Sequence, residues 1–438
     1  MYTSHIGKKF LELYNRNNNL NMTAKQYFED IHFPLFYDNE RYLHSPGNTP
    51  LFQLIAEHKT KDSEARKTKK NDIINKTTEF VKNIELIPDM SFAIGYPSAD
   101  VMGTTSGQIT ALKIPISEED IFASWIGVGF GIGVNGGLNI LFDNELVFNA
   151  IEEGFKIYRD YVNENDNIKN KIETWNSVWF THRLSDNYVG EYTKANFQPV
   201  TVSKKGEVIM ERSTWVKILL ALSNKLPNVN LTGYVYSFGQ MNRTIGFIQF
   251  NLPELKELSD LYKVLFAKSD VLKNKNLLEL YETEYSFQKA CQMGVIGLRA
   301  MQPKDLKQFI PGGKDNSLPK LKSDEKSIIN YYIYQLWIIA MLNNKDLLEL
   351  AEKTAKALIE FIDLDKKVRM TRTRVVEDLL GTRNRKDFIE KINSIIEIDS
   401  SLSEISNELV NQIMLNIAPF DIPLFVTLLR FKYLSFTK

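Results

Sequence analysis

The chain has 438 residues, of which 43% are hydrophobic, 11% aromatic and 25% charged, a composition typical of folded globular proteins and not of disordered ones. Lysine plus arginine and aspartate plus glutamate each number 54, so the formal net charge is zero. The protein as a whole is therefore not a polycation that coats nucleic acid or anionic membranes, and any such contact must come from a local patch. The length predicts two or three domains at roughly 150 residues per domain.

The cysteine content and the apolar runs indicate the compartment. A single cysteine, Cys291, excludes an internal disulfide, and with no histidine nearby in sequence we interpret it as a buried, unreactive thiol. The first residues lack the apolar stretch of a secretory signal. The longest apolar run, 331–342, is shorter than the roughly 20 residues that a bilayer requires. We therefore expect a cytoplasmic protein with no membrane partner.

The beginning of the chain has helical patterning. Ile6, Phe10 and Leu13 share one helical face, and Thr23 suits the cap of a second, short helix. After a loop, the range 62–80 again has a helical pattern but is strongly charged. This pattern predicts either a solvated helix or a positive arm.

Short runs typical of strands begin near Ser91 and are separated by glycine. Apolar residues alternate with glycine over 124–134, and Asn135-Gly136 favours a hairpin turn, so the pattern predicts a returning strand over 137–142. A helix is expected after Asp143. The remaining elements predicted in this part are strands at 174–181, 197–203 and 207–211, a helix capped by Ser213 that runs to about 225, and a second hairpin formed by 232–238 and 244–250.

After Pro253 the periodicity is helical to the end, apart from a loop at 310–319. A helix is expected to start near Asp324, another to end at Gly381 before a cap at Thr382, and the last to open at Asp421. We therefore predict an α+β fold. A domain of residues 1–252 contains a mixed or antiparallel sheet with helices and a glycine-rich hairpin, and a helical bundle domain of residues 253–438 follows it.

Motifs for nucleotide and metal chemistry are weak. Residues 131–136 match G-x-G-x-x-G, but they lead into a predicted strand and not into a helix whose amino end would face a pyrophosphate. We interpret these glycines as a flat face for close packing against a helix, or against an aromatic ring or a nucleic-acid strand. The sequence contains no GxxxxGK[ST] motif, and the histidines lack metal-ligand spacing. We predict no metal site and no cofactor.

The most unusual feature is a basic segment in the second half of the chain. Arginine grips phosphate through two parallel hydrogen bonds, so this segment suits a nucleic-acid backbone. Acidic residues close by, such as Glu377 and Asp387, favour a second interpretation, in which the face is solvated or paired within the protein. The candidate residues are Arg369, Arg372, Arg374, Arg383, Arg385 and Lys386.

Two loops carry further candidates. Asn and Gln side chains can read base edges and an arginine can hold the adjacent phosphate, so the tip of the second hairpin suits a duplex contact through Gln240, Asn242 and Arg243. Turn chemistry alone also selects glycine and asparagine there. Lys314 follows two glycines in the loop at 310–319 and is a candidate phosphate contact, although a flexible connection between helices explains the same residues.

The succession of a mixed α+β portion with glycine- and asparagine-bearing loops, a basic surface and a helical bundle resembles the large subunit of type I CRISPR surveillance complexes over most of the chain. The resemblance implies a non-catalytic, nucleic-acid-binding subunit of an antiviral complex, with other protein subunits and RNA or DNA as partners. It also implies that Gln240, Asn242 and Arg243 read a duplex, that Lys314 contacts a phosphate, and that the basic segment holds a nucleic-acid backbone.

Two alternatives belong to other classes of protein. The first is a metal-dependent nuclease or another phosphodiester-acting enzyme whose acids, such as Asp89, Asp143 and Glu145, meet only in the fold. The second is an interaction scaffold, in which aromatic surfaces formed by 33–37 and 331–337 dock other proteins.

Overall fold

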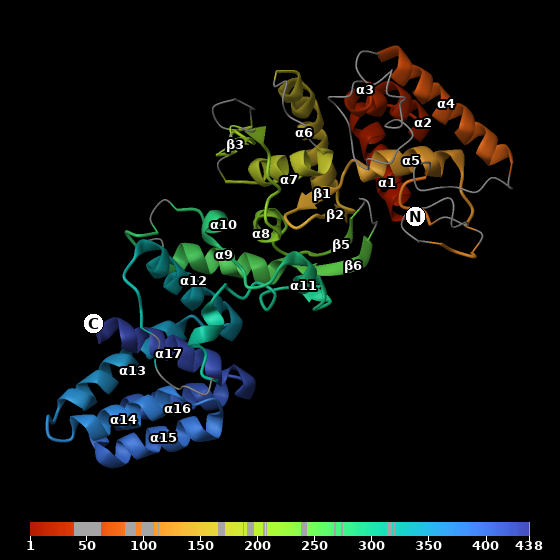
Figure 1. The fold of residues 1–438 in the computed structure, drawn as a ribbon. Coiled ribbons are helices and arrows are strands. Elements are labelled where there is room, and N and C mark those ends of the chain that lie inside the picture. The colour runs from red at the N-terminus through yellow and green to blue at the C-terminus, as the bar shows by residue number, and fades with distance from the viewer. Residues whose placement is uncertain are drawn as a thin grey trace. The chain divides into compact units, whose positions relative to one another are not determined.

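The computed structural model describes residues 1–38, 63–83, 93–97, 109–112, 114–164, 171–186, 188–190, 197–204, 206, 208–237, 243–266, 269–272, 275–312, 318 and 320–437. The chain divides into two compact units, which are described separately. The first comprises Met1–Leu252 with Ser286–Val295, and the second comprises Pro253–Tyr285 with Ile296–Lys438. Figure 1 shows strands together with helices in the first unit and mainly helices in the second. The predicted α+β class is thus confirmed.

The first unit contains helices and a sheet. Its helical elements are α1 (Tyr2–Asn18), α2 (Ala24–Tyr27), the π-helix η1 (Phe28–His32), α3 (Phe33–Phe36), α4 (Ser63–Lys82), α5 (Glu118–Val128), α6 (Glu145–Glu164), α7 (Ile172–Arg183), α8 (Trp215–Lys225) and α11 (Phe287–Cys291). Its strands are β1 (Ile132–Val134), β2 (Leu138–Phe142), β3 (Thr201–Val202), β4 (Val208–Ile209), β5 (Asn230–Ser237) and β6 (Arg243–Asn251), and β7 (Val295–Ile296) lies where the chain passes to the second unit.

The five strands of the main sheet have the order β1-β2-β5-β6-β7. The pairs β1–β2, β2–β5 and β5–β6 are antiparallel, and β3 pairs with β4 as a separate ribbon. Both predicted hairpins are present. The tip of the first includes Gly136 and Gly137, both at positive φ, and the long second hairpin pairs Tyr234 with Phe247.

The strand predicted to start at Ser124 is wrong, because residues up to Val128 belong to helix α5. The glycines serve helix packing: a Cβ on Gly7 of α1 would lie 1.9 Å from the Ala123 carbonyl oxygen, and one on Gly127 would lie 1.9 Å from the Thr3 carbonyl oxygen. The two backbones therefore cross in direct contact. Residues Ile121–Val128 are buried on every side, so this helix lacks the one-sided apolar pattern that identifies helices in sequence.

The strand predicted at 174–181 is also wrong, since these residues belong to helix α7. Its β-favouring tryptophans are buried against α6, where the Trp175 indole donates to the Gly154 carbonyl at 3.0 Å and the Trp179 indole to the Ala150 carbonyl at 2.7 Å. Tertiary packing and two satisfied indole groups thus outweigh the local strand preference.

Two predicted helix caps are displaced along the chain. Helix α8 is capped by Thr214, whose hydroxyl accepts from the Lys217 amide at 3.3 Å, whereas the Ser213 hydroxyl donates to the Ser177 carbonyl at 3.3 Å. Helix α15 is capped by Asn384, because the Thr382 hydroxyl donates back to the Leu379 carbonyl at 2.7 Å. The predicted cap at Thr23 is confirmed, with a full capping box.

The aromatic runs that the scaffold hypothesis placed on the surface are largely core. Phe33, Phe36 and Tyr37 are buried in the first unit. Tyr334 and Trp337 are buried in the second. The expectation of aromatic docking surfaces at 33–37 and 331–337 is therefore wrong for these side chains.

The second unit is helical, as predicted for this part of the chain. Its elements are α9 (Leu252–Phe266), α10 (Leu277–Leu280), η5 (Leu306–Phe309), α12 (Glu325–Leu342), α13 (Asp346–Asp363), α14 (Arg369–Leu380), α15 (Arg385–Ile398), η6 (Ser400–Leu402), α16 (Ser403–Leu415), η7 (Pro419–Asp421) and α17 (Ile422–Phe436). Asp324 caps α12. No helix among the described residues is long and apolar enough to cross a membrane.

Candidate nucleic-acid interface

Aromatic rings gather on the β5–β6 hairpin of the first unit, where Phe247 is exposed and Tyr234 is partly buried. Tyr234 and Phe247 are directly paired across the two strands, with ring centroids 5.3 Å apart. Tyr2, at the start of α1, lies 5.2 Å from the Tyr234 ring and 5.0 Å from the Phe247 ring. We call Tyr2, Tyr234 and Phe247 the aromatic platform. His5 stacks on Tyr2 at 5.6 Å and extends the platform along α1.

The platform follows from the alternation of the strands. Ile248 and Phe250 of β6 are buried, whereas Phe247 and Gln249 are exposed, as expected when successive side chains point to opposite faces. Phe247 is 60% exposed, which leaves much of an apolar ring in contact with solvent. Such a ring on a sheet surface can stack with a nucleobase, because every base has a flat apolar face.

Electrostatics near the platform are nearly balanced. The cations of α1 nearest to Tyr2 are paired: Lys8 with Asp120 at 2.6 Å, and Lys9 with Glu12 at 2.9 Å. Burial, together with the charge of Asp143, raises the pKa of Tyr2 to about 12, so its phenol is neutral at physiological pH. The platform therefore offers stacking and neutral hydrogen bonds more than positive charge.

Only one of the predicted hairpin-tip residues lies in the described part of the chain. Arg243 is exposed and opens strand β6 opposite Ser237. It is on the same hairpin as the aromatic platform. Gln240 and Asn242 lie outside the described residues, as does Lys314.

In the second unit, two of the predicted arginines are held by backbone carbonyl groups. Arg372 donates through Nη1 to the Phe361 carbonyl, in the last turn of α13, at 2.6 Å, and its guanidinium lies 4.6 Å from the Phe361 ring. Arg385 donates through Nη2 to the Ile417 carbonyl, just after α16, at 2.5 Å. The last carbonyls of a helix lack partners within the helix, and Arg372 satisfies one of them, whereas Arg385 holds the loop that follows α16.

The other members of the basic segment differ in exposure and pairing. Arg369 forms an ion pair with Asp363 at 3.1 Å, and Lys386 pairs with Glu390 at 3.7 Å. Arg383 is exposed. Arg374 is exposed and has no side-chain partner among the residues that the structure describes. The segment is thus not one continuous basic surface, and Arg374 is its most available cation.

Arg430 was not predicted from the sequence, yet it is the most deeply buried of the arginines that the structure describes. It is 4% exposed and donates to the carbonyls of Leu380, at the end of α14, and of Phe309, the latter at 3.0 Å. Burial lowers its pKa to about 10, so the guanidinium is still charged at physiological pH. The sequence did carry a signal for this buried role, since Arg430 is the one arginine in the otherwise largely apolar sequence of α17.

Two of the three acids named in the nuclease hypothesis, Asp143 and Glu145, belong to the described residues, and they do not form a metal site. Asp143 bonds to His5 Nε2 at 2.6 Å, and Glu145 pairs with Arg16 at 2.8 Å. Asp89 lies outside the described residues. Within the described ranges, no cluster of three or more histidine, cysteine, aspartate or glutamate side chains is arranged to hold a metal ion.

The glycines of β1 pack against helix α7, as the first of the interpretations predicted. A Cβ on Gly133 would lie 2.6 Å from the Glu173 carbonyl oxygen. The Asn176 amide donates to the carbonyls of Gly129 and Gly131 at 2.8 and 2.9 Å. The segment is therefore filled by protein, which leaves no space there for a dinucleotide. Cys291 is buried, and burial raises its pKa to about 12, so its thiol is a poor nucleophile.

No protein-family model, curated protein or solved structure matches the chain. The chemistry of the chain's own side chains therefore has to indicate its function. Of the sites described above, the aromatic platform has the exposure and the chemistry of a recognition surface. Sequence reasoning selected the hairpin that carries it but missed the rings, whose signal was Tyr234 and Phe247 at alternating positions of adjacent strands.

Proposed function

We propose that the protein is a non-catalytic subunit that binds single-stranded nucleic acid by stacking bases on the aromatic platform. The observation that carries this proposal is the 60% exposure of Phe247 beside the rings of Tyr2 and Tyr234. Sheet-mounted aromatic rings are a common way to bind unpaired bases. Arg243, on the same hairpin, supplies a cation for a neighbouring phosphate.

The resemblance to large subunits of type I CRISPR surveillance complexes gives the proposal a specific form. The bound nucleic-acid strand is then guide RNA or target DNA, and other protein subunits of an antiviral complex are partners. The near balance of charge at the platform is compatible with this role, because a subunit within an assembly shares its nucleic acid with neighbours that can supply cations. Gentle purification of the tagged protein from its own host, followed by a denaturing nucleic-acid gel, tests this form. A discrete RNA band with co-purifying proteins is expected.

Binding itself is tested by fluorescence anisotropy with labelled single-stranded RNA, single-stranded DNA and a duplex. Phe247→Ala should weaken single-strand binding about 5- to 150-fold, since stacking on an aromatic side chain contributes about 1–3 kcal/mol per base. Phe247→Trp should retain binding because it keeps a flat ring. Phe420→Ala is the matched control, because that ring is 69% exposed but belongs to the second unit.

Equal affinities of Phe247→Ala and the unaltered protein for every single strand would contradict the platform assignment. An equal loss of binding in Phe420→Ala would show that the effect is not specific to the aromatic platform. Preference for the duplex over both single strands would count against base stacking as the mode of recognition. Thermal unfolding of each variant confirms that the exposed substitutions leave the fold intact.

A further inference from the structure

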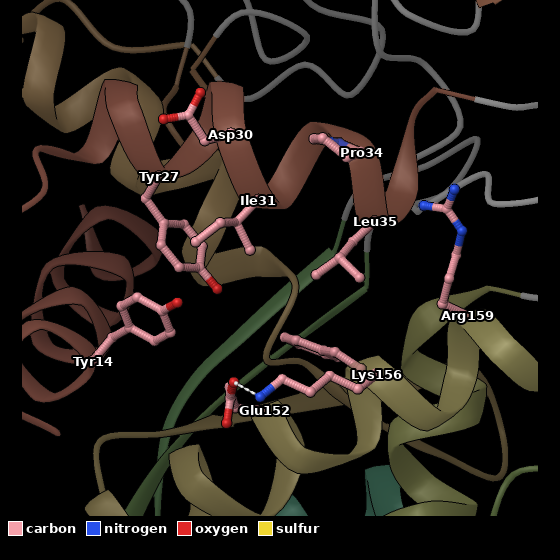
Figure 2. A pocket seen from close by; sticks show the side chains of 10 residues that line it. Tyr14, Tyr27, Asp30, Ile31, Pro34, Leu35, Glu152, Lys156 and Arg159 are labelled. Atoms are coloured by element: carbon pink, nitrogen blue, oxygen red, sulfur yellow. Dashed lines mark ion pairs between the residues drawn. The ribbon is translucent and has the colours of Figure 1, made fainter. Parts of the chain in front are cut away.

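A cleft of about 270 Å³ opens in the first unit between α1, the segment from α2 to α3, and α6. Figure 2 shows that Tyr14 and Tyr27 form one wall, that Ile31 and Leu35 point in from another, and that Glu152 and Lys156 lie opposite them. Aromatic and aliphatic walls with a few polar groups are typical of small-molecule sites. The cleft is lined by different residues from the aromatic platform.

The two tyrosines present hydroxyl groups to the cleft (Figure 2). Their rings meet edge to face at 5.0 Å, which fixes their orientation. Tyr27 is 2% exposed, and no group in the described part of the chain hydrogen-bonds to its hydroxyl or to that of Tyr14. Burial, and then the charge of Glu152, hold the pKa of Tyr27 well above its ordinary value. A neutral phenol oxygen is thus available to a hydrogen-bond donor.

The charges of the cleft favour a cation. Lys156 pairs with Glu152 at 3.4 Å, but the lysine side chain is 77% exposed, and exposed pairs of this kind are weak. Asp30 at the rim is exposed and has no partner among the described residues. Arg159, in contrast, pairs with Asp38 at 3.2 Å. Of the charged residues that line the cleft, Asp30 is thus the one without a partner in the described part of the chain, so the unpaired charge here is negative.

The helix that forms one wall has an irregular backbone at the cleft. The π-helix Phe28–His32 carries Asp30 and Ile31, and Pro34 follows it within α3. Proline lacks the amide hydrogen that would continue the α-helical ladder, which accounts for the wider turn before it. Single π-helical turns occur frequently at functional sites, and this one sets the positions of two cleft residues.

We propose that this cleft binds an organic cation, a primary ammonium group on a short apolar chain. The ammonium group replaces Lys156 at Glu152 and donates to the Tyr27 hydroxyl, while the chain lies along Ile31 and Leu35. Tyrosine rings also attract cations through their faces. Two sources share this chemistry, namely a free alkylamine and the lysine side chain of a peptide.

Three probes with the same apolar body separate the head groups: hexylamine, hexanol and hexanoate, measured by isothermal titration calorimetry on the full chain. Hexylamine should bind at least tenfold more tightly than either of the others. Glu152→Gln should remove most of this preference. Lys156→Met should strengthen hexylamine binding severalfold because it removes the competing cation. Glu349→Gln is the matched control, since Glu349 forms a similar exposed pair with Lys353 on α13.

Tighter binding of hexanoate, or weaker hexylamine binding in Lys156→Met, would overturn the proposal, because an anion site responds in those ways. Equal binding of all three probes would also overturn it. Two short peptides then identify the source: both have an acetylated amino terminus, and one contains a lysine with a free side-chain amine where the other has norleucine. Binding of the lysine peptide as tightly as hexylamine indicates a side chain, and binding of hexylamine alone indicates a free amine. Nucleic-acid binding should be unchanged in Glu152→Gln, so the two proposals fail separately.

Discussion

Side chains suited to recognition are exposed in the first unit but bound to backbone groups in the second. In the first unit, Phe247 of the aromatic platform remains 60% exposed, where a partner can reach it. In the second unit, Arg372 and Arg385 belong to a conspicuous basic segment but donate to backbone carbonyls near helix ends. The number of arginines in a sequence segment thus does not give the number of guanidinium groups that can bind a phosphate. That number depends on the atoms that each guanidinium already contacts in the fold.

Among the described residues, each unit also buries one basic side chain, His32 in the first and Arg430 in the second, and the two differ in charge. Burial lowers the pKa of His32 in the first unit to about 3, so the imidazole is neutral there. Arg430 in the second unit keeps its charge and shares it with two carbonyl groups. Substitutions and pH can therefore perturb one unit while the other serves as an internal control.

The largest effect is expected for Arg430→Met. The substitution leaves the carbonyls of Leu380 and Phe309 buried without their donor, which should cost about 3–5 kcal/mol of unfolding free energy in the second unit. Urea unfolding combined with hydrogen exchange of peptides from each unit measures this loss. The aromatic platform should bind nucleic acid as before. A stability change below about 1 kcal/mol would show that the helix ends do not depend on this arginine.

Acid should weaken the first unit through His32. Its pKa is lowered from 6.5 to about 3 by burial, against the opposing effect of a hydrogen bond with the Trp125 backbone. Because the unfolded chain binds the proton more readily, the stability is fully present above pH 6.5 and is lost as the pH falls toward 3. Between pH 7 and 5 the loss should be about 2 kcal/mol. His32→Leu should flatten this dependence, and an unchanged slope would contradict the assignment.

Much of the fold could be predicted because its signals are local. Alternation identified the hairpin of β5 and β6, and cap residues such as Asp324 identified helix starts. Helices α5 and α7 were missed because both are buried on several sides. The close crossing of Gly7 and Gly127 depends on residues far apart in the chain, which no local pattern contains.

The candidate site could be predicted only in part, for the same reason. The sequence indicated the hairpin with Arg243, but Tyr2 reaches Tyr234 from the other end of the first unit's sequence. The roles of Arg372 and Arg385 depend on carbonyl groups that tertiary packing brings within 2.6 and 2.5 Å. The residue type predicted that the guanidinium groups donate hydrogen bonds, but only the fold shows which acceptors they have.

A smaller effect separates neighbouring arginines of helix α14. Arg372→Ala removes a hydrogen bond to Phe361 and should lower the unfolding free energy of the second unit by about 1–2 kcal/mol. Arg374→Ala should change it by less than about 0.5 kcal/mol, because that side chain is exposed and has no partner in the described part of the chain. Urea unfolding of the two variants gives the comparison. Equal losses would contradict the distinction between a structural and an available arginine.

The smallest effect concerns the salt dependence of nucleic-acid binding. If the exposed cation Arg374 contacts a phosphate, Arg374→Ala should reduce the slope of log affinity against log salt concentration by about one and weaken binding only a few-fold at low salt. Arg372→Ala should leave the slope unchanged, because its guanidinium is already engaged. Phe247→Ala should lower the affinity at every salt concentration with little change in slope, since stacking releases no counterions. An unchanged slope in Arg374→Ala would show that this side chain contacts no phosphate, and a reduced slope would place α14 in contact with nucleic acid.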